Sequence, residues 1–312
     1  MSDIEAMNKR RLPVTVIGGY LGTGKTTLVN HLLRHAGGRR LAVLVNDFGA
    51  LPIDRDLIVA AEGDTLDISG GCVCCSYGSE LMEALIELPH RRPDLDAVLL
   101  ETSGVALPGM VANAVSLLAD YRIDGTIVLV DAETVLERAA DPYLGDTITR
   151  QIAAADLLLV NRCDLVDDRT RAEIRDWLSA QAPKARQIES VRAAIPPALA
   201  LGIDHQPGRS PGLATPGAPD AAALYESIEL GFAGTVDATA FAHALASSAD
   251  GLLRAKGFMQ DCVRGWVSLQ MVGSRFEIEP APAQERGRLV VIGRRGRLDR
   301  DEIERHLAEA RR

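Results

Sequence analysis

The sequence lacks an excess of basic residues, a long apolar run and a hydrophobic segment near its start. Its 312 residues include 34 Lys and Arg against 43 Asp and Glu, giving a net charge of −9. An acidic chain without a basic block is a poor candidate for nucleic-acid binding. No apolar run reaches the roughly 20 residues that a membrane span needs, and residues 1–11 resemble no secretory signal. We therefore expect no nucleic-acid partner and no membrane association.

The spacing of the cysteines argues against a secreted protein stabilised by disulfides. The chain has five cysteines, and three of them, at positions 72, 74 and 75, lie within four residues. Such crowding is unlike the spaced cysteines of a secreted disulfide framework. The absence of a signal and of a disulfide pattern together predicts a cytoplasmic protein.

Short β-branched apolar runs alternate with longer helical patterns from Pro13 to about Gln187. The runs are almost continuously apolar, which is typical of parallel strands buried on both faces. This alternation predicts a three-layer α/β domain with a mostly parallel sheet. The expected strands are Val14–Ile17, Leu41–Val45, Ala97–Leu100, Thr126–Val130 and Leu157–Val160, and the expected helices are Thr26–Arg34, Ser79–Leu88, Pro108–Leu118 and Thr170–Ala180.

The composition changes after about Val191. Residues 196–219 are rich in proline and glycine, the composition of an extended linker. Beyond them we expect strands at Tyr225–Leu230, Trp266–Val272 and Leu289–Ile292, a helix capped by Asp237, and a last helix capped by Asp299. The predicted organisation is a P-loop domain at 1–190, a linker at 191–219 and a small α+β domain at 220–312.

Residues 19–26, GYLGTGKT, satisfy the phosphate-loop pattern G-x-x-x-x-G-K-[ST]. They follow an expected strand and precede an expected helix, which is the context that the motif requires. Glycines let backbone N–H groups turn toward phosphate oxygens, and the positive end of the helix dipole adds to the attraction. Lys25 brings a cation to the β- and γ-phosphates, and the hydroxyl of Thr26 is an Mg²⁺ ligand. The segment therefore predicts a nucleoside triphosphate site with Mg²⁺.

The sequence NRCD at 161–164 follows the last expected strand of this domain. The carboxylate of Asp164 can accept hydrogen bonds from guanine N1–H and its 2-amino group. Adenine lacks this donor pair and would leave the carboxylate unpaired. Arg162 stands where the guanine-specificity element N-K-x-D of GTPases has a lysine that lies across the base, and a guanidinium can also stack there. We therefore predict GTP as the ligand, with an Asx turn at a strand end as the alternative.

Two further polar segments follow strand ends. Glu101–Gly104 has an acidic residue that suits Mg²⁺ held through water and a glycine whose N–H can approach the γ-phosphate. Asn46–Gly49 ends the second expected strand. Either Asp47 or Glu101 is the carboxylate on the metal side, and the sequence leaves this open. A plain turn is the alternative for each, but ligands of α/β sheets bind at the carboxyl ends of strands.

The three clustered cysteines, Cys72, Cys74 and Cys75, lie between these two segments. Thiolates favour Zn²⁺ and other borderline-soft ions such as Co²⁺. In an extended segment Cys75 faces away from the other two, so convergence needs a turn, which the two preceding glycines allow. The fourth ligand is left open as water, a carboxylate such as Asp47, or a residue of a second chain in a homodimer. Buried free thiols or a redox centre are the alternatives, and Cys163 and Cys262 are expected in the core.

Taken in this order, the elements resemble the CobW-type P-loop GTPases, which are relatives of the nickel-insertion GTPases of urease and hydrogenase. The matching segments are GGYLGTGKTT, VNDFG, SGGCVCC, ETSGVALP and NRCD, with a looser likeness in RAKGF and VVIGRR. The resemblance implies GTP hydrolysis coupled to delivery of Zn²⁺ or Co²⁺ to a client protein. The candidate nucleotide contacts are Gly22, Thr23, Gly24, Lys25, Thr26, Thr27, Asn161 and Asp164; the transition-metal ligands are Cys72, Cys74 and Cys75; the catalytic and Mg²⁺ residues are Lys25, Thr26, Asp47, Glu101 and Gly104.

Two features depart from the family pattern. The family's N-E-F-G-E is here NDFGA at 46–50, so one acidic side chain is shorter and another is absent. The six histidines are scattered and form no metal-storing tract.

No glutamine evidently positions a water, so we expect a slow GTPase that acts as a metallochaperone. The alternatives are an ATP-dependent kinase or ATPase with structural cysteines and a scaffold stabilised by nucleotide. The client and the physiological metal are left open.

Overall fold

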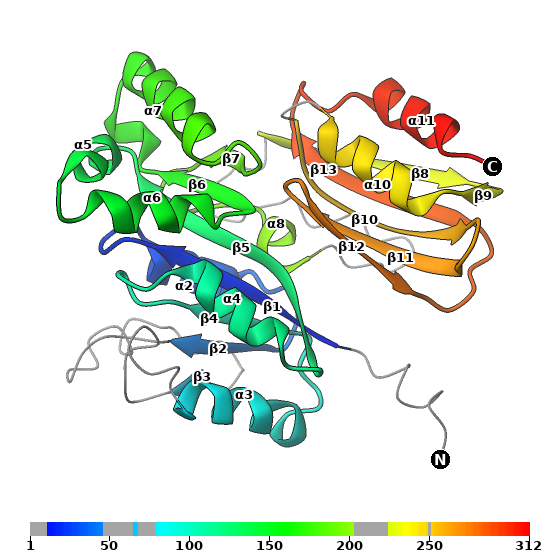
Figure 1. Ribbon diagram of the computed structural model, residues 1–312, viewed down its shortest axis with the longest axis horizontal. Helices are drawn as coiled ribbons and strands as arrows, with labels where there is room; N and C mark the ends of the chain where they lie inside the picture. The colour runs from blue at the N-terminus through cyan, green and yellow to red at the C-terminus, as the bar shows by residue number, and fades with distance from the viewer. Residues whose placement is uncertain (1–10, 46–64, 68–78, 203–223, 249–250) are drawn as a thin grey trace. The chain divides into compact units, whose positions relative to one another are not determined.

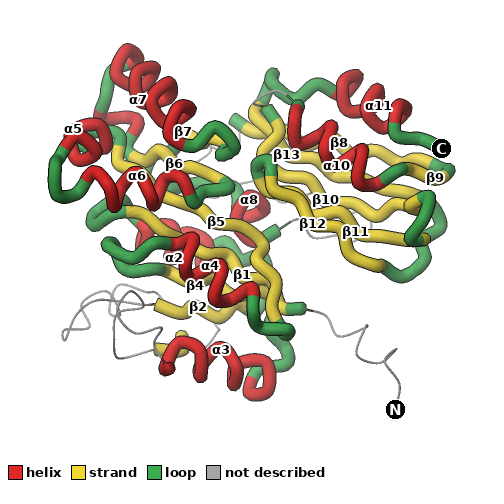
Figure 2. Tube along the Cα trace, viewed as in Figure 1, coloured by secondary structure: helices red, strands yellow, loops and turns green. Residues whose placement is uncertain are grey.

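The computed structural model describes residues 11–45, 65–67, 79–202, 224–248 and 251–312. The chain divides into two compact units, one of Met1–Pro183 with Gln187–Ala194 and one of Lys184–Arg186 with Ile195–Arg312. Figure 2 shows that the strands gather into two separate sheets. No helix among these described residues is long and apolar enough to cross a bilayer.

The first unit is built on a seven-stranded sheet in the order β3-β2-β4-β1-β5-β6-β7 (Figure 1). All pairings from β3 to β6 are parallel. Every residue of β1 and of β4 is buried, which requires cover on both faces of the sheet. The α/β fold expected from the sequence is thus confirmed. The strands are β1 (Leu12–Gly19), β2 (Leu41–Val45), β3 (Thr65–Asp67), β4 (Ala97–Glu101), β5 (Tyr121–Asp131), β6 (Leu157–Asn161) and β7 (Arg186–Glu189).

Helices follow most of these strands and complete the layers. Leu85 and Val111, from two different helices, share a core cluster with Val14 and Val16. Alternate residues of a strand point to one face, so both helices cover the same face of β1. One of them begins at Pro108, whose missing N–H is harmless in the first turn. The helices are α2 (Lys25–Arg34), α3 (Ser79–Arg91), α4 (Pro108–Ser116), α5 (Val135–Ala140), α6 (Gly145–Ala153) and α7 (Asp168–Gln181).

The carboxyl ends of the parallel strands meet along one edge of this sheet. Glu101 at the end of β4 pairs with Ile17 of β1 and with Val45 at the end of β2. Asp131 at the end of β5 pairs with Asn161 at the end of β6. The loops after these strands therefore leave from the same edge, where open α/β sheets bind their ligands.

The second unit is an antiparallel sheet covered by two helices. Its strand order is β12-β11-β10-β13-β8, with β9 paired in parallel to β10. Phe241 and Leu245 of α10 and Ile303 and Leu307 of α11 belong to one core cluster with the sheet. This is the α+β arrangement expected from the sequence. The elements are α8 (Pro197–Leu201), β8 (Tyr225–Phe232), β9 (Thr235–Val236), α10 (Ala238–Ser247), β10 (Leu252–Asp261), β11 (Gly265–Val272), β12 (Arg275–Pro280), β13 (Gly287–Arg294) and α11 (Arg300–Glu309).

Both helix caps predicted in this unit are confirmed. The carboxylate of Asp237 accepts the backbone N–H of Ala240 at 2.9 Å. The carboxylate of Asp299 accepts the N–H groups of Asp301 and Glu302 at 2.9 and 3.2 Å. Each cap satisfies donors that a helix start would otherwise leave without a partner, which is worth about 1 kcal/mol.

The structure corrects the sequence interpretation of residues 196–219 at their start. Instead of extended linker, Pro197–Leu201 form helix α8, and its last four residues are buried. The buried guanidinium of Arg254 donates a hydrogen bond to the carbonyl of Leu199 at 2.8 Å. Proline is compatible with the first turn of a helix, and packing of the apolar residues outweighs the proline-rich composition. Residues 203–219 of the predicted linker lie outside the described residues.

The carboxylate of Asp261 generates a stability prediction for the second unit. It is buried and accepts the N–H groups of Ala238, Val263 and Arg264 at 3.0, 3.0 and 2.8 Å, and the guanidinium of Arg264 pairs with it. The hydrogen bond from the Arg264 side chain, with the backbone donors, holds the pKa of Asp261 well below its usual value. The ionised form is therefore the one that stabilises the fold.

We expect Asp261→Asn to lower the free energy of unfolding by about 2 kcal/mol, because an amide N–H₂ then faces other donors. Since the folded-state pKa is depressed, wild-type stability is fully present above about pH 4 and falls as the pH drops further, whereas the variant lacks this component. Urea unfolding followed by Trp266 fluorescence in a Trp177→Phe background measures both effects. Asp146→Asn, at a position with an 80% exposed side chain, is the matched control; equal stability of Asp261→Asn and this control would contradict the prediction.

Candidate nucleotide-binding site

The phosphate loop connects β1 to α2 through glycines in conformations that other residues avoid. Gly19, Gly22 and Gly24 have φ values of 132°, 80° and 103°. A Cβ at Gly19 would collide with the carbonyl of Leu129, and one at Gly24 would lie 2.6 Å from Nδ2 of Asn161. At Gly19 and Gly24 glycine is therefore favoured by both backbone conformation and space, and at Gly22 by conformation alone. The loop ends at Lys25, the first residue of α2, so the positive end of the helix dipole lies at the loop.

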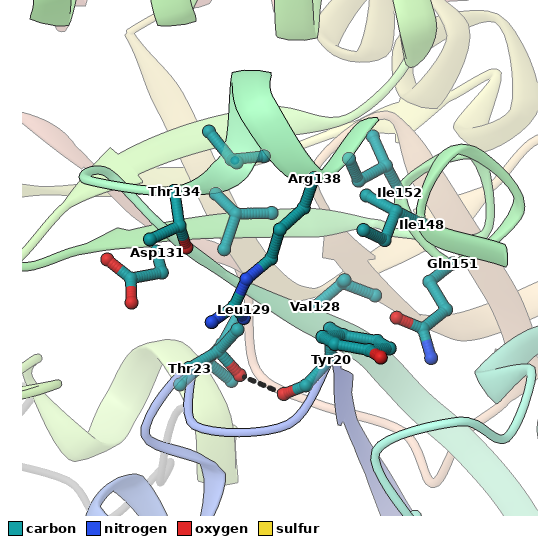
Figure 3. Close-up of a pocket in the computed structure, with 12 residues that line it drawn as sticks. Tyr20, Thr23, Val128, Leu129, Asp131, Thr134, Arg138, Ile148, Gln151 and Ile152 are labelled. Carbon is teal, nitrogen blue, oxygen red and sulfur yellow. Dashed lines mark hydrogen bonds between the residues drawn. The ribbon is translucent and has the colours of Figure 1, made fainter. Parts of the chain in front are cut away.

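Side chains from outside the loop hold its carbonyl groups. Three consecutive carbonyls each accept a hydrogen bond from a side chain outside the loop, at the end of β6, in the turn after it or on α5. The bonds are Arg138 to Leu21 at 3.0 Å, Arg162 to Gly22 at 3.1 Å and Asn161 to Thr23 at 2.9 Å. The preceding carbonyl, of Tyr20, accepts the hydroxyl of Thr23 at 2.9 Å (Figure 3). It also accepts the ammonium of Lys25 at 3.2 Å. With its carbonyls bound in this way, the loop is fixed in one conformation.

Thr26 and Glu101 form the second part of the site. The Thr26 hydroxyl donates to Oε1 of Glu101 at 2.9 Å, and Glu101 is buried. The next residue, Thr102, donates its N–H to the carbonyl of Ile17 at 2.9 Å, which fixes the end of β4 beside β1. Hydroxyl and carboxylate oxygens are ligands that Mg²⁺ prefers, so this donor pair fits the predicted ion. The other candidate carboxylate, Asp47, lies outside the described residues.

Gly104 lies directly against the phosphate loop. A Cβ there would collide with the Leu21 side chain and lie 2.9 Å from the Leu21 nitrogen. Nε2 of Gln151 donates hydrogen bonds to the carbonyl of Gly104 at 3.1 Å and to the carbonyl of Ala106 at 2.8 Å. Sequence inspection missed Gln151, because nothing in its local pattern marks it. Its burial inside a folded helix is the signal that identifies it.

Asn161 is almost completely buried and joins two loops. Its Nδ2 donates to Thr23 of the phosphate loop, and its Oδ1 accepts the N–H of Ala193 at 2.8 Å. Both ends of the amide thus contact protein, so the side chain organises the site. Asp164, three residues later, is exposed beside this position and presents its carboxylate to solvent.

Arg162, which is expected to lie across the base, contacts two protein groups. Its guanidinium donates to Oδ2 of Asp131 at 2.5 Å and to the carbonyl of Gly22 at 3.1 Å. Asp131 is buried at the end of β5, and its burial is stabilised by this pairing. Arg162 therefore links the segment 161–164 to the phosphate loop, and Asp131 is a residue of the candidate site that the sequence did not reveal.

The proposed metal ligands Cys72, Cys74 and Cys75 lie outside the described residues. Within the described ranges, no group of three or more His, Cys, Asp or Glu side chains is placed to hold a metal ion. Cys163 is buried as expected, and burial raises the pKa of its thiol to about 11. Cys262, expected in the core, is exposed instead.

A small cavity of about 20 Å³ adjoins the loop on the side that Arg138 approaches (Figure 3). Its lining includes Tyr20 and Thr23 from the loop and Asp131 from the end of β5. Arg138 and Gln151 line it from α5 and α6. The pocket marks the place where these two helices meet the loop.

Comparisons with known proteins match both units of the chain to described families. Residues 13–189 match the family described as the CobW/HypB/UreG nucleotide-binding domain, and residues 225–311 match the CobW C-terminal domain. The chain is 34% identical over 226 residues to a protein of Pseudomonas aeruginosa named zinc chaperone CobW, covering 62% of this chain and 60% of that protein. It is 28% identical to zinc-regulated GTPase metalloprotein activator 1 of Dictyostelium discoideum, covering 62% and 48%.

The solved structure of Zn(II)-bound YjiA GTPase from Escherichia coli aligns with 97% of this chain and 100% of its own, at 21% identity and a TM-score of 0.44. The match to the two sequence relatives is incomplete, since the chain spans about three fifths of the length of the first and about half of the second.

Asn161→Ala tests whether this buried amide organises the loop. The change leaves the carbonyl of Thr23 and the N–H of Ala193 without their partner, and each buried unpaired group costs about 1–3 kcal/mol. We expect the affinity for GDP, measured with a fluorescent analogue, to fall at least tenfold. Asn113→Ala, on the exposed surface of α4, is the matched control. Unchanged GDP affinity in Asn161→Ala would show that the loop holds its conformation without the amide.

Proposed function

The chain belongs to the CobW-type P-loop GTPase family, and from this premise we propose that it hydrolyses GTP and delivers Zn²⁺ or Co²⁺ to a client protein. The observation that carries the proposal is the convergence at one sheet edge of the phosphate loop, the Thr26–Glu101 pair and the segment 161–164. The names of the two sequence relatives, a zinc chaperone and a GTPase metalloprotein activator, support the same class of activity. The expected cytoplasmic location is part of this proposal.

The nucleotide is held by backbone N–H groups of the loop, the Lys25 ammonium and the start of α2. Gly22, Gly24 and Thr27 belong to the same binding segment. Thr26 and Glu101 would hold Mg²⁺, which neutralises charge on the β- and γ-phosphates when it is bound. Gly104 brings its backbone toward the γ-phosphate. Slow hydrolysis is part of the proposal, because the sequence offers no evident glutamine to position the attacking water.

Guanine is read by Asp164, whose exposed carboxylate accepts from the N1–H and 2-amino groups of the base. Arg162 helps to position Asp164, because its bonds to Asp131 and to the carbonyl of Gly22 hold the segment 161–164 against the phosphate loop. Selectivity for guanine therefore comes from the carboxylate of Asp164, which is held in place by its segment. A base without the two donors of guanine leaves this carboxylate unpaired.

The transition-metal ion is the cargo, and its proposed ligands are the thiolates of Cys72, Cys74 and Cys75. Support comes from the preference of thiolates for such ions and from the place of these residues in the chain, between Asp47 and Glu101. Both flanking segments follow strands of the nucleotide edge, so loss of the γ-phosphate would change the affinity for the ion. A ligand that binds two states with different affinity shifts the balance between them, and this converts hydrolysis into directed release.

The cargo proposal is tested by titrating Zn²⁺ and Co²⁺ into the protein with GTP, with GDP and without nucleotide. We expect the affinity to depend on the nucleotide, and Cys72→Ala/Cys74→Ala/Cys75→Ala to lose at least a hundredfold in Zn²⁺ affinity while GTP binding stays intact. Cys262→Ala, which removes an exposed thiol elsewhere, controls for the loss of any cysteine. The same Zn²⁺ affinity in the triple variant and the wild type would refute the thiolate site.

Guanine recognition is tested separately by Asp164→Asn. An amide offers one acceptor and one donor, so it mismatches the 2-amino group of guanine and matches the 2-oxo group of xanthine. We expect the affinity for GTP to fall about a hundredfold and the affinity for XTP to rise, as measured by competition with a fluorescent nucleotide. Asp168→Asn, with a 92% exposed side chain, is the control. Displacement of GTP by an equal concentration of ATP in the wild type would instead favour an ATP-dependent enzyme.

A further inference from the structure

Helices α5 and α6 each bind one of the two segments that approach the phosphates. From α5, Arg138 donates to the carbonyl of Leu21 at 3.0 Å, and its guanidinium lies 5.4 Å from the centre of the Tyr20 ring. From α6, Gln151 donates to the carbonyls of Gly104 and Ala106. Figure 3 shows Arg138 and Gln151 entering the pocket on either side of Tyr20. One pair of helices therefore contacts both the phosphate loop and the segment after β4.

The two helices are joined tightly to each other. A Cβ on Gly145, the first residue of α6, would collide with the carbonyl of Ala139 in α5. Between them, Oδ1 of Asp141 accepts the N–H groups of Tyr143 and Leu144 at 2.7 and 3.1 Å, which fixes the short connection. Close packing and a hydrogen-bonded turn make independent movement of the helices costly. The positions of Arg138 and Gln151 are thus set together.

The two segments that the helices hold also touch each other. Gly104 lies against Leu21 with no space for a side chain. The contacts therefore form a closed ring. Arg138 binds Leu21, Leu21 packs against Gly104, Gly104 binds Gln151, and the packed helices α5 and α6 join Gln151 to Arg138. Within this ring Gln151 is 1% exposed, and its amide nitrogen donates only to neutral carbonyls. Its role therefore depends on shape and hydrogen bonding rather than on charge.

We infer that Gln151 is a positioning residue that holds Gly104 where the γ-phosphate of bound GTP meets it, and that Arg138 is its counterpart for the phosphate loop. This inference rests on the proposed function, because it assigns a residue to the recognition of GTP over GDP. The backbone N–H groups of the phosphate loop, which Arg138 helps to position, contact the α- and β-phosphates that GDP and GTP share, whereas Gly104 meets the γ-phosphate alone. Loss of the Gln151 bonds therefore weakens GTP binding selectively, and loss of the Arg138 bond weakens both nucleotides alike.

The decisive variant is Gln151→Met, which keeps the length of the side chain and removes both donors. We expect its affinity for a non-hydrolysable GTP analogue to fall about tenfold while its GDP affinity stays within about twofold of the wild type. Gln181→Met, the same change at the end of α7, is expected to alter neither. A parallel loss for both nucleotides would mean that Gln151 only stabilises the fold, and unchanged affinities would mean that it does not position Gly104.

Two further measurements keep the inference separate from the proposed function and from folding. Amide hydrogen exchange at residues 104–106 of nucleotide-free Gln151→Met should be at least tenfold faster than in the wild type. Equal exchange rates in the two proteins would overturn the inference, whether or not the wild type binds guanine nucleotides. Failure of the wild type to bind any guanine nucleotide would refute the proposed function separately. Arg138→Ala alters a partly exposed side chain, so it spares the core. It should weaken GTP and GDP equally, and a selective loss of GTP would contradict the assigned division of roles.

Discussion

The site depends on a turn whose carbonyl groups are bound from outside. A glycine-rich loop has many accessible conformations, and only one of them directs successive N–H groups toward phosphate oxygens. Asn161, Arg162 and Arg138 each bind one carbonyl of the loop, and they come from the end of β6, the turn after it and helix α5. Because these donors belong to different elements, the loop acquires its conformation only when the whole edge of the sheet has formed.

The parallel sheet makes this convergence possible. Its register brings Glu101 level with Ile17 and Asp131 level with Asn161, so that residues distant in the chain meet at one edge. The two buried carboxylates there have partners of different kinds: Asp131 forms an ion pair with Arg162, and one oxygen of Glu101 accepts the hydroxyl of Thr26. A buried carboxylate without such a partner would be strongly unfavourable. The same arrangements that lower the cost of burial therefore place the groups that a nucleotide and its Mg²⁺ require.

Much of the fold could be predicted from local patterns. The runs at 41–45, 97–100 and 157–160 form strands because short, continuously apolar segments fit a sheet buried on both faces. Local patterns failed at Pro197–Leu201, where burial of a short apolar helix outweighed proline. They also failed to assign α5 and α6 within residues 132–156, where polar and apolar residues mix in short helices. The positions missed there include Arg138 and Gln151.

The sequence by itself predicted the chemical types of the site, namely the phosphate loop, the hydroxyl of Thr26, an acidic residue at Asp47 or Glu101, and the carboxylate of Asp164 proposed to contact the base, because each follows an expected strand end. Only the tertiary structure decided that Asn161 and Arg162 bind the loop and that Gln151 holds Gly104. A side chain's hydrogen-bond partner depends on which distant carbonyl lies within about 3 Å of it. Strand register and helix packing set that distance, and local sequence patterns do not encode it.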